Sequence, residues 1–420
     1  PVTCVLGRPS IAERPEPIVE AAALLLGARP DVRFLSALRR GNVHGAVDMG
    51  LAPGLLPGRV ALDDGREWYR DAWDMVPVER GLDATGILTA AAEGKIETLV
   101  LLGADPLTDF PDRDLATRGL TGARTVIAVD CFLTDSARQA DVVLPVGGYA
   151  ETGGTTTNLE GRVSRLHRKV TPPGTARDYW VIATDLAYRL GSDLGLESLE
   201  AIWAEVERLS AAHAGVTRAV LDSPSARDGV VVPVAPGTVF ADAGGPGGPL
   251  SGEQGTPVSI EGTRIAPDQP DGEAHPADEA GEPAETDEPA EPAPGRPPLV
   301  RFTRPAEPAP APPPDSYSLR LVASRKLYDR GTWVAHAPSL AGLAPGTAVR
   351  CNPADVDRIG VSDGGRVKAT SSRGSATVEV VRDPGVPKGV AAIYVNQEGP
   401  NPTEFIDASA PVTEIRLETV

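Results

Sequence analysis

Apolar runs alternate with helical patterns along the first half of the chain. Short β-branched or leucine-rich runs predict buried strands, and the segments between them repeat apolar residues with the period of a helix. The expected strands cover residues 2–6, 32–35, 98–102 and 126–129, and the expected helices cover 16–26, 84–93 and 112–118. Continuous apolar strands separated by helices are typical of a parallel sheet covered on both faces. We therefore predict an α/β fold with a doubly wound parallel sheet.

Two further helices follow this expected sheet. Apolar residues recur every three or four positions from Tyr179 to Leu190, and the pattern stops at Gly191, a residue type that readily ends a helix in the left-handed conformation. A second helix begins at Ser198, which suits an N-cap, and places Glu200 in its first turn. We expect the α/β region to cover residues 1–220.

The pattern changes to a period of two in the last hundred residues. Tyr317, Leu319 and Leu321 alternate with polar residues, and two alternating runs around a turn at 371–374 predict a hairpin. Short strands need protected edges, and closing the sheet protects them. We expect residues 317–420 to form a small β-barrel, with a short helix near 353–358 that ends at Gly360.

Between these regions the composition changes to proline, alanine and acid. Residues 268–291 hold ten acidic residues and no lysine or arginine, so the rest of the chain carries −8 of the formal charge of −18. Such a segment buries too little apolar surface to fold. We predict a largely disordered linker over residues 221–316, and we expect that deleting about 266–314 leaves both folded regions intact. An apolar island at 299–302 is either a docking motif or plain chain, and we favour plain chain.

Charge and cysteine content exclude several classes of protein. A formal charge of −18 has the wrong sign for a nucleic-acid-binding surface. Cys4, Cys131 and Cys351 are too far apart for a local metal clip and too few for a disulfide framework, which favours a reducing, cytosolic compartment. No apolar stretch approaches the roughly 20 residues of a membrane span. The chain begins at Pro1, directly before a strand and without a signal peptide, so we expect a fragment of a longer protein.

Candidate ligand-binding residues follow two of the predicted strands. Gly103 and Asp105 follow the strand that ends at residue 102, and Asp130 follows the next strand. Open α/β sheets bind ligands at this carboxyl edge. A glycine lets a ligand approach the backbone, and a carboxylate can accept a hydrogen bond from a ribose or a base. Ordinary βα turns and caps use the same residue types, so both interpretations stay open.

The segment 151–162 is the most polar loop of the chain. Thr155, Asn158 and Arg162 supply hydrogen-bond donors for a phosphate or a heterocycle, although neither common phosphate-loop motif is present. A loop that satisfies its own hydrogen bonds is equally compatible with this composition. The five histidines and three cysteines form no local metal or nucleophile motif, so we expect no catalytic residue and no metal site in this chain.

Several motifs together resemble a known superfamily. The segments Gly-Asn-Val-His-Gly-Ala-Val-Asp-Met-Gly at 41–50, Leu-Gly-Ala-Asp-Pro at 102–106, Ala-Asp-Val-Val-Leu-Pro at 140–145 and the loop 151–162 resemble the molybdopterin oxidoreductase superfamily in order and spacing. Residues 352–355 and 360–364 look like that superfamily's dinucleotide-binding domain, a double-psi β-barrel. Within the superfamily, the chain is most similar to the C-terminal part of the large iron–sulfur subunits of NADH-quinone oxidoreductases, the enzymes also called respiratory complex I.

The resemblance implies a part of a proton-translocating complex that passes electrons from NADH through flavin and 4Fe–4S clusters to quinone. It places the clusters upstream of Pro1 and places the chain among the other subunits, peripherally on the cytoplasmic face of the bacterial plasma membrane. Relatives that bind the pterin cofactor usually have Asn where this chain has Asp105, and a carboxylate there repels a pyrophosphate. The resemblance therefore implies a scaffold that holds no cofactor.

The resemblance also implies which residues would form the relic cofactor site. They are Gly103, Asp105, Asp130, Thr155, Asn158 and Arg162. The alternative is a molybdopterin-dependent oxidoreductase such as a formate dehydrogenase, in which these loops and the barrel hold a pterin dinucleotide.

Overall fold

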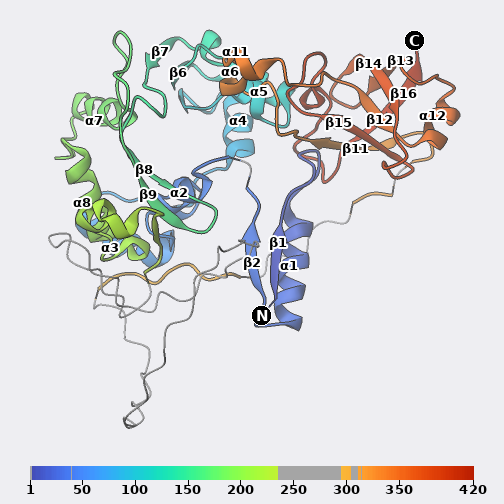
Figure 1. Ribbon diagram of the computed structural model, residues 1–420. Helices are drawn as coiled ribbons and strands as arrows, with labels where there is room; N and C mark the ends of the chain where they lie inside the picture. The colour runs from blue at the N-terminus through green and yellow to red at the C-terminus, as the bar shows by residue number, and fades with distance from the viewer. Residues whose placement is uncertain (1, 39, 235–294, 304–310, 314) are drawn as a thin grey trace, which may run out of the picture.

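Figure 1 shows the computed structural model, which describes residues 2–38, 40–234, 295–303, 311–313 and 315–420. An α/β region extends to residue 234, and a closed β-barrel begins at residue 319. In Figure 1 the barrel lies at the upper right, beside α5 (Pro106–Asp109) and α6 (Arg113–Gly122) of the α/β region. The predicted class, an α/β region followed by a barrel, is confirmed. No helix of the described residues is long and apolar enough to cross a membrane.

The parallel strands of the α/β region form two separate sheets within the described residues. One sheet contains β5 (Thr98–Leu102), β6 (Thr125–Asp130) and β7 (Val142–Pro145), whereas β1 (Thr3–Leu6) pairs only with β2 (Arg33–Ser36). The sequence pattern had placed these strands in one sheet. Between β2 and β5 the chain forms α2 (Val43–Asp48), the ribbon β3 (Leu55–Leu56) and β4 (Val60–Ala61), and α3 (Leu62–Trp73). The connection from β2 to β5 is therefore not a single short crossover helix, because these additional elements lie between the two strands.

Helices α4 (Ala84–Ala92) and α6 pack together against one face of the three-stranded sheet. Asp83 and Asp112 accept hydrogen bonds at the two N-termini, from Gly86 N at 2.8 Å and Leu115 N at 2.9 Å. A Cβ at Gly119 would lie 2.9 Å from a methyl carbon of Leu88, so this glycine allows the close approach of the two helices. The Leu88 and Leu115 side chains belong to the core beneath the sheet.

The other face of this sheet is covered only in part by the described residues. Helix α7 (Tyr179–Arg189) packs Ile182 against Val129 and Val146. On the edge strand β5, however, the side chains of Val100 and Leu102 remain about half exposed. The prediction of a sheet covered on both faces therefore holds for the central strand β6, and it is wrong for the edge strands β5 and β7 within the described residues, since Val142 and Val143 of β7 are exposed as well.

The α/β region continues past the predicted boundary at residue 220. The strands β8 (Gly154–Thr157), β9 (Arg162–Leu166) and β10 (Val230–Val231) form an antiparallel sheet, beside α8 (Leu199–Leu209) and α9 (Arg218–Asp222). Ser198 caps α8 as predicted, since its hydroxyl accepts a hydrogen bond from Ala201 N at 3.1 Å. Val230 and Val232 are buried against Val163 and Trp203. Residues 221–234 thus belong to the α/β region because they complete one of its cores.

The other end of the predicted linker also packs on the α/β region. The guanidinium of Arg296 donates to the carbonyl of Glu207 at 3.1 Å, near the end of α8, and Val300 N donates to Arg59 O at 2.7 Å. Pro297 is buried, whereas Val300 and Phe302 are about half exposed. Residues 295–300 of the predicted linker therefore contact the α/β region, while Val300 and Phe302 of the apolar island remain largely exposed. The ten clustered acidic residues lie outside the described residues.

Residues 319–420 form a closed barrel, as the period of two predicted. Its strands are β11 (Leu319–Ser324), β12 (Val349–Cys351), β13 (Arg366–Thr370), β14 (Ser375–Arg382), β15 (Val390–Tyr394) and β16 (Glu414–Thr419). Their order around the barrel is β11-β15-β12-β14-β13-β16. The predicted hairpin is β13–β14, and the predicted short helix is α12 (Pro353–Ile359), which ends at Gly360 with φ 78°. Alternate residues of β11 are buried, which explains the sequence pattern.

Candidate functional site

Gly103 lies where the sequence placed it, at the carboxyl end of β5. Its φ of 58° requires the left-handed conformation, and its N–H donates to Val129 O at 2.8 Å. A Cβ at this position would lie 2.9 Å from the hydroxyl oxygen of Tyr179, on α7. The space that a ligand was expected to use at Gly103 is therefore filled by a side chain of this protein. Burial raises the pKa of Tyr179, and the nearby Asp130 carboxylate adds to this effect.

Asp105 is buried and holds two loops together. One carboxylate oxygen accepts hydrogen bonds from the Ser136 hydroxyl at 2.5 Å and from Ser136 N at 3.1 Å. The same hydroxyl oxygen accepts a hydrogen bond from Leu107 N at 3.1 Å. Ser136 follows β6 and was not predicted, because nothing in its local sequence marks it as a partner. The Asp105 carboxylate oxygen that accepts these hydrogen bonds therefore has a structural role in joining two loops.

Asp130 lies at the end of β6, where it shapes the following turn. Its carboxylate accepts a hydrogen bond from Phe132 N at 3.2 Å. Burial, followed by the charge of Asp130, raises the pKa of the adjacent Cys131 to about 11. A thiol with a raised pKa is a weaker nucleophile at neutral pH, because the reactive form is the thiolate.

Of the residues predicted in the polar loop, Asn158 makes its hydrogen bonds within that loop, whereas Arg162 also donates to Gly229 O at 3.4 Å. The Asn158 side-chain oxygen accepts hydrogen bonds from Glu160 N and Arg162 N, both at 2.9 Å, and Arg162 pairs with the Glu160 carboxylate at 2.8 Å. Thr155 faces Arg165 in the β8–β9 ladder. Asn158 and Arg162 thus form the turn between two strands, as the alternative of a self-satisfied loop required.

Two motifs far apart in the sequence meet beside this hairpin. Asn42, with φ 63°, accepts a hydrogen bond from Thr157 N at 2.8 Å through its side-chain oxygen. A Cβ at Gly45 would lie 2.0 Å from that oxygen, so a larger residue would displace Asn42. The two segments line a cavity of about 260 Å³. The buried Nε2 of His44 has no hydrogen-bond partner among the described residues.

The six predicted residues therefore form two groups rather than one site. Gly103, Asp105 and Asp130 lie at the carboxyl edge of the β5–β6–β7 sheet, whereas the three others lie on the β8–β9 hairpin, as Figure 1 shows. They come from separate sheets of the α/β region.

A larger polar cavity of about 380 Å³ lies between the α/β region and the barrel. Asp105, Arg113 and Arg138 line it from the first region, and Arg330, Gln397 and other polar residues line it from the second. The buried Oε1 of Gln397 has no hydrogen-bond partner among the described residues. The sequence did not predict this cavity, because its walls come from segments about 300 residues apart.

The charges that line this cavity do not favour a pterin dinucleotide. The cavity is lined by four carboxylates and three guanidinium groups, a balance that disfavours a pyrophosphate. These are Asp105, Asp135, Glu398 and Glu404, and Arg113, Arg138 and Arg330. Tyr179 covers Gly103, and Asn158 is occupied within its own turn. Among the described residues, no group of three or more His, Cys, Asp or Glu side chains could hold a metal ion.

Comparison with known proteins supports the family and leaves the branch open. The chain is 38% identical over 196 residues to the second G-type subunit of NADH-quinone oxidoreductase from Rhizobium meliloti, a match that covers 46% of this chain and 23% of the relative. It is 34% identical over 198 residues to the NADPH-Fe(3+) oxidoreductase subunit alpha of Geobacter sulfurreducens, covering 47% and 23%. It is 33% identical over 180 residues to the F420-dependent formate dehydrogenase subunit alpha of Methanocaldococcus jannaschii, covering 42% and 26%. The match spans about a quarter of the length of each relative.

Structure and family comparisons cover more of the chain. The structure of acetylene hydratase from Pelobacter acetylenicus aligns over 80% of this chain and 46% of its own, at 15% identity and a TM-score of 0.46. The family described as "Molybdopterin oxidoreductase" matches residues 21–189, and the one described as "Molydopterin dinucleotide binding domain" matches residues 319–415. Residues 21–189 are therefore similar to the molybdopterin oxidoreductase family, and residues 319–415 are similar to the dinucleotide-binding domain family.

Proposed function

We propose that this chain is a scaffold portion of the large iron–sulfur subunit of an NADH:quinone oxidoreductase. The observation that carries the proposal is that residues of the expected cofactor site already have partners within the chain. Tyr179 occupies the approach to Gly103, Ser136 binds the Asp105 carboxylate, and the turn 158–162 satisfies its own hydrogen bonds. Groups that already have partners within the chain gain little from binding a cofactor. Sequence identity alone favours the quinone-linked and the formate-linked relatives almost equally.

In this role the α/β region and the barrel supply shape and contact surface to sister subunits. The electrons from NADH pass through flavin and iron–sulfur clusters that other parts of the complex hold. The chain contributes no catalytic residue, and it lies peripherally on the cytoplasmic face of the membrane as part of that complex.

The test is elemental and pterin analysis of the full-length subunit within its purified complex. We expect iron and sulfide, no stoichiometric molybdenum or tungsten, and no pterin released on denaturation. Arg113→Ala, which changes the interregion cavity, should leave NADH:quinone activity unchanged. Stoichiometric molybdenum or tungsten together with pterin would end the scaffold proposal.

The second candidate is a molybdopterin-dependent oxidoreductase such as a formate dehydrogenase. The observation that favours it is the cavity of about 380 Å³, in which Gln397 keeps a buried oxygen without a partner among the described residues. This volume lies in the range of small-molecule sites. Formate oxidation by the purified protein, abolished in Gln397→Ala, would favour this candidate.

A further inference from the structure

The barrel core contains a residue from the other end of the chain. Ala12, in the loop between β1 and α1 (Glu16–Ala28), is 3% exposed and packs in the same cluster as Leu321 and Ile415 of the barrel. Ile11 packs against this cluster as well. These two residues precede the barrel by about 300 positions, so the barrel does not bury its core with residues 319–420 alone.

The same loop adds its backbone to the barrel. Ile11 N donates to Ala323 O at 2.9 Å, Thr413 N donates to Ala12 O at 3.1 Å, and Arg14 N donates to Pro411 O at 3.1 Å. Glu13 and Val412 form an antiparallel bridge. An extended segment that pairs its backbone with strands and inserts alternate side chains is a known mode of peptide recognition. We name residues 10–14 the docking segment.

The first residue of the docking segment fixes its entry. The Ser10 hydroxyl oxygen accepts hydrogen bonds from Ala323 N at 3.0 Å and from Ala12 N at 3.1 Å, and Ser10 is 1% exposed. The Arg8 guanidinium donates to the carbonyls of Ser10 and Glu13, which holds the loop in shape before it reaches the barrel. Burial of a fully paired hydroxyl makes the position specific for a small hydrogen-bonding residue.

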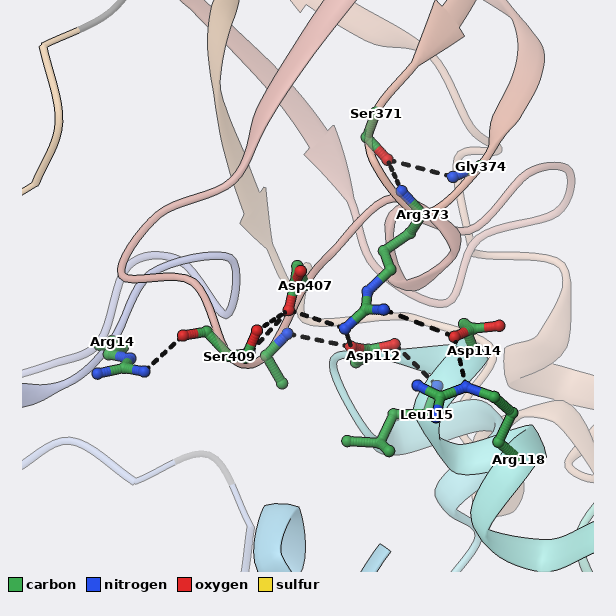
Figure 2. A network of polar contacts seen from close by, with 11 residues as sticks. Arg14, Asp112, Asp114, Leu115, Arg118, Ser371, Arg373, Gly374, Asp407 and Ser409 are labelled. Atoms are coloured by element: carbon green, nitrogen blue, oxygen red, sulfur yellow. Dashed lines mark hydrogen bonds and ion pairs between the residues drawn. The ribbon is translucent and has the colours of Figure 1, made fainter. Parts of the chain in front are cut away.

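A second contact lies beside the docking segment and is drawn in Figure 2. The Asp112 carboxylate, fully buried, caps α6, forms an ion pair with Arg373 at 2.9 Å and accepts a hydrogen bond from Ala408 N at 3.2 Å. Arg373 also pairs with Asp407 at 2.8 Å. The carbonyl of Ser409 in the same barrel loop accepts a hydrogen bond from the guanidinium of Arg14 at 2.5 Å. The docking segment and the N-terminus of α6 therefore both contact the same barrel loop.

A third polar contact lies between the two regions. One Asp109 carboxylate oxygen accepts hydrogen bonds from Arg325 of the barrel at 3.1 Å, from Asn396 at 3.3 Å and from Arg40 at 2.8 Å. All three contacts use residues of the α/β region before position 115 and residues of the barrel after position 320. They do not involve the linker.

We propose that the barrel is a docking domain for the extended segment 10–14, and that this segment and the Asp112 contact hold the two regions together without a covalent linker. The barrel surface fits a short extended segment that has a small hydroxyl residue, here Ser10, and a buried alanine two positions later, here Ala12. Because every contact is formed by groups within the two regions, cutting the chain between them leaves the interface whole.

The experiment uses the full chain with a protease recognition sequence inserted between residues 304 and 310, so that Arg296 and Val300, which contact the α/β region, stay joined to that region after cleavage. After complete cleavage, the two pieces should co-elute on size exclusion at micromolar concentration and physiological salt. Ala12→Asp places a charge in the barrel core and should weaken the association about 100-fold, so that the cleaved pieces separate. The matched control is Arg29→Ala, an exposed ion pair with Asp31 on the same N-terminal unit, which should leave co-elution unchanged.

A milder variant covers the case in which Ala12→Asp prevents folding of the uncut chain. Ser10→Ala removes one hydroxyl that binds two backbone N–H groups and should weaken association about 10-fold, with an unchanged circular dichroism spectrum before cleavage. Separation of the unmodified pieces after cleavage would overturn the proposal. Unchanged association in both variants would show that residues 10–14 are not the docking segment.

Discussion

The barrel and the α/β region bury their apolar residues in different ways. The barrel has one continuous core, in which Leu321, Val349 and Val380 are fully buried. The α/β region divides its buried residues among four smaller clusters. The helix and strands of its first unit, β1-α1-β2, contribute only Ala22 to the buried apolar residues, and Val5 and Leu24 are more than half exposed.

The difference follows from how each region treats strand edges. A closed barrel leaves no free edge, so every strand can place alternate side chains in one interior. Short open sheets must be covered by helices, and each helix–sheet pair then makes a separate small core. The barrel should accordingly respond to core substitutions as one unit, while the α/β region responds locally.

The largest expected effect comes from shortening a barrel core residue. Leu321→Ala should lower the free energy of unfolding by about 4 kcal/mol, because it leaves a cavity in a core with no exposed wall. Leu24→Ala, on α1 at 57% exposure, should change it by less than about 0.5 kcal/mol. Urea unfolding followed by circular dichroism gives both values. Equal effects of the two substitutions would contradict the contrast between the regions.

The next effect is a pH dependence confined to the α/β region. His213 is fully buried, with Nδ1 2.7 Å from the Ser210 hydroxyl oxygen. Burial lowers its pKa from 6.5 to about 4, opposed by the charge of Asp48 and aided by that of Arg59. The unfolded chain therefore binds more protons between pH 6.5 and 4. The free energy of unfolding therefore keeps its full value above pH 6.5 and falls by about 3 kcal/mol as the pH drops to 4.

Tryptophan fluorescence measures this loss, because Trp203 contacts the His213 ring at 5.7 Å between centroids. His213→Gln should flatten the profile between pH 6.5 and 4. The control is His336→Gln, at an exposed histidine, which should keep the profile of the unmodified protein. A profile that stays steep in His213→Gln would assign the dependence to other groups.

A smaller effect is expected at the contact between the regions. Arg373→Ala leaves the buried Asp112 carboxylate without its cation and should cost about 2 kcal/mol, less than for a fully buried pair because the Arg373 side chain is 22% exposed. Arg118→Ala removes an exposed pair with Asp114 four residues away on the same helix, and it should cost under about 0.5 kcal/mol. The midpoint of thermal unfolding should be lower for Arg373→Ala than for Arg118→Ala. Identical midpoints would show that the Asp112–Arg373 pair does not stabilise the contact between the regions.

The smallest effect concerns the segment that follows the linker. Arg296→Ala removes a hydrogen bond to the last turn of α8 and should cost about 1 kcal/mol. Deleting residues 240–290 should leave the stability unchanged, whereas deleting 266–314 should lower it, since the longer deletion removes Arg296 and Val300. If both deletions leave the stability unchanged, the contacts of Arg296 and Val300 do not stabilise the fold, and the predicted linker only connects the two regions.

The sequence predicted those features that depend on neighbours along the chain. The 3.6-residue period and Ser198 located α7 and α8, and the period of two located β11 and the hairpin β13–β14. The predicted disorder of the acidic segment concerns residues that lie outside those described by the structure. The α/β region continues past the predicted boundary at 220, because Val230 packs on partners that lie far away in the sequence, and Arg296 of the predicted linker contacts α8 for the same reason.

The candidate site shows the same division. The sequence identified Asp105 and Asn158 as polar residues at strand ends, which is a local property. Whether they face a ligand or the chain itself depends on Ser136, 31 residues from Asp105, and on the turn geometry at Asn158. Ser10 and Ala323, which are 313 residues apart, join two regions that have separate patterns. Periodicity reports local burial, whereas the partner that buries a residue is chosen by packing in three dimensions, and so the tertiary structure decided it.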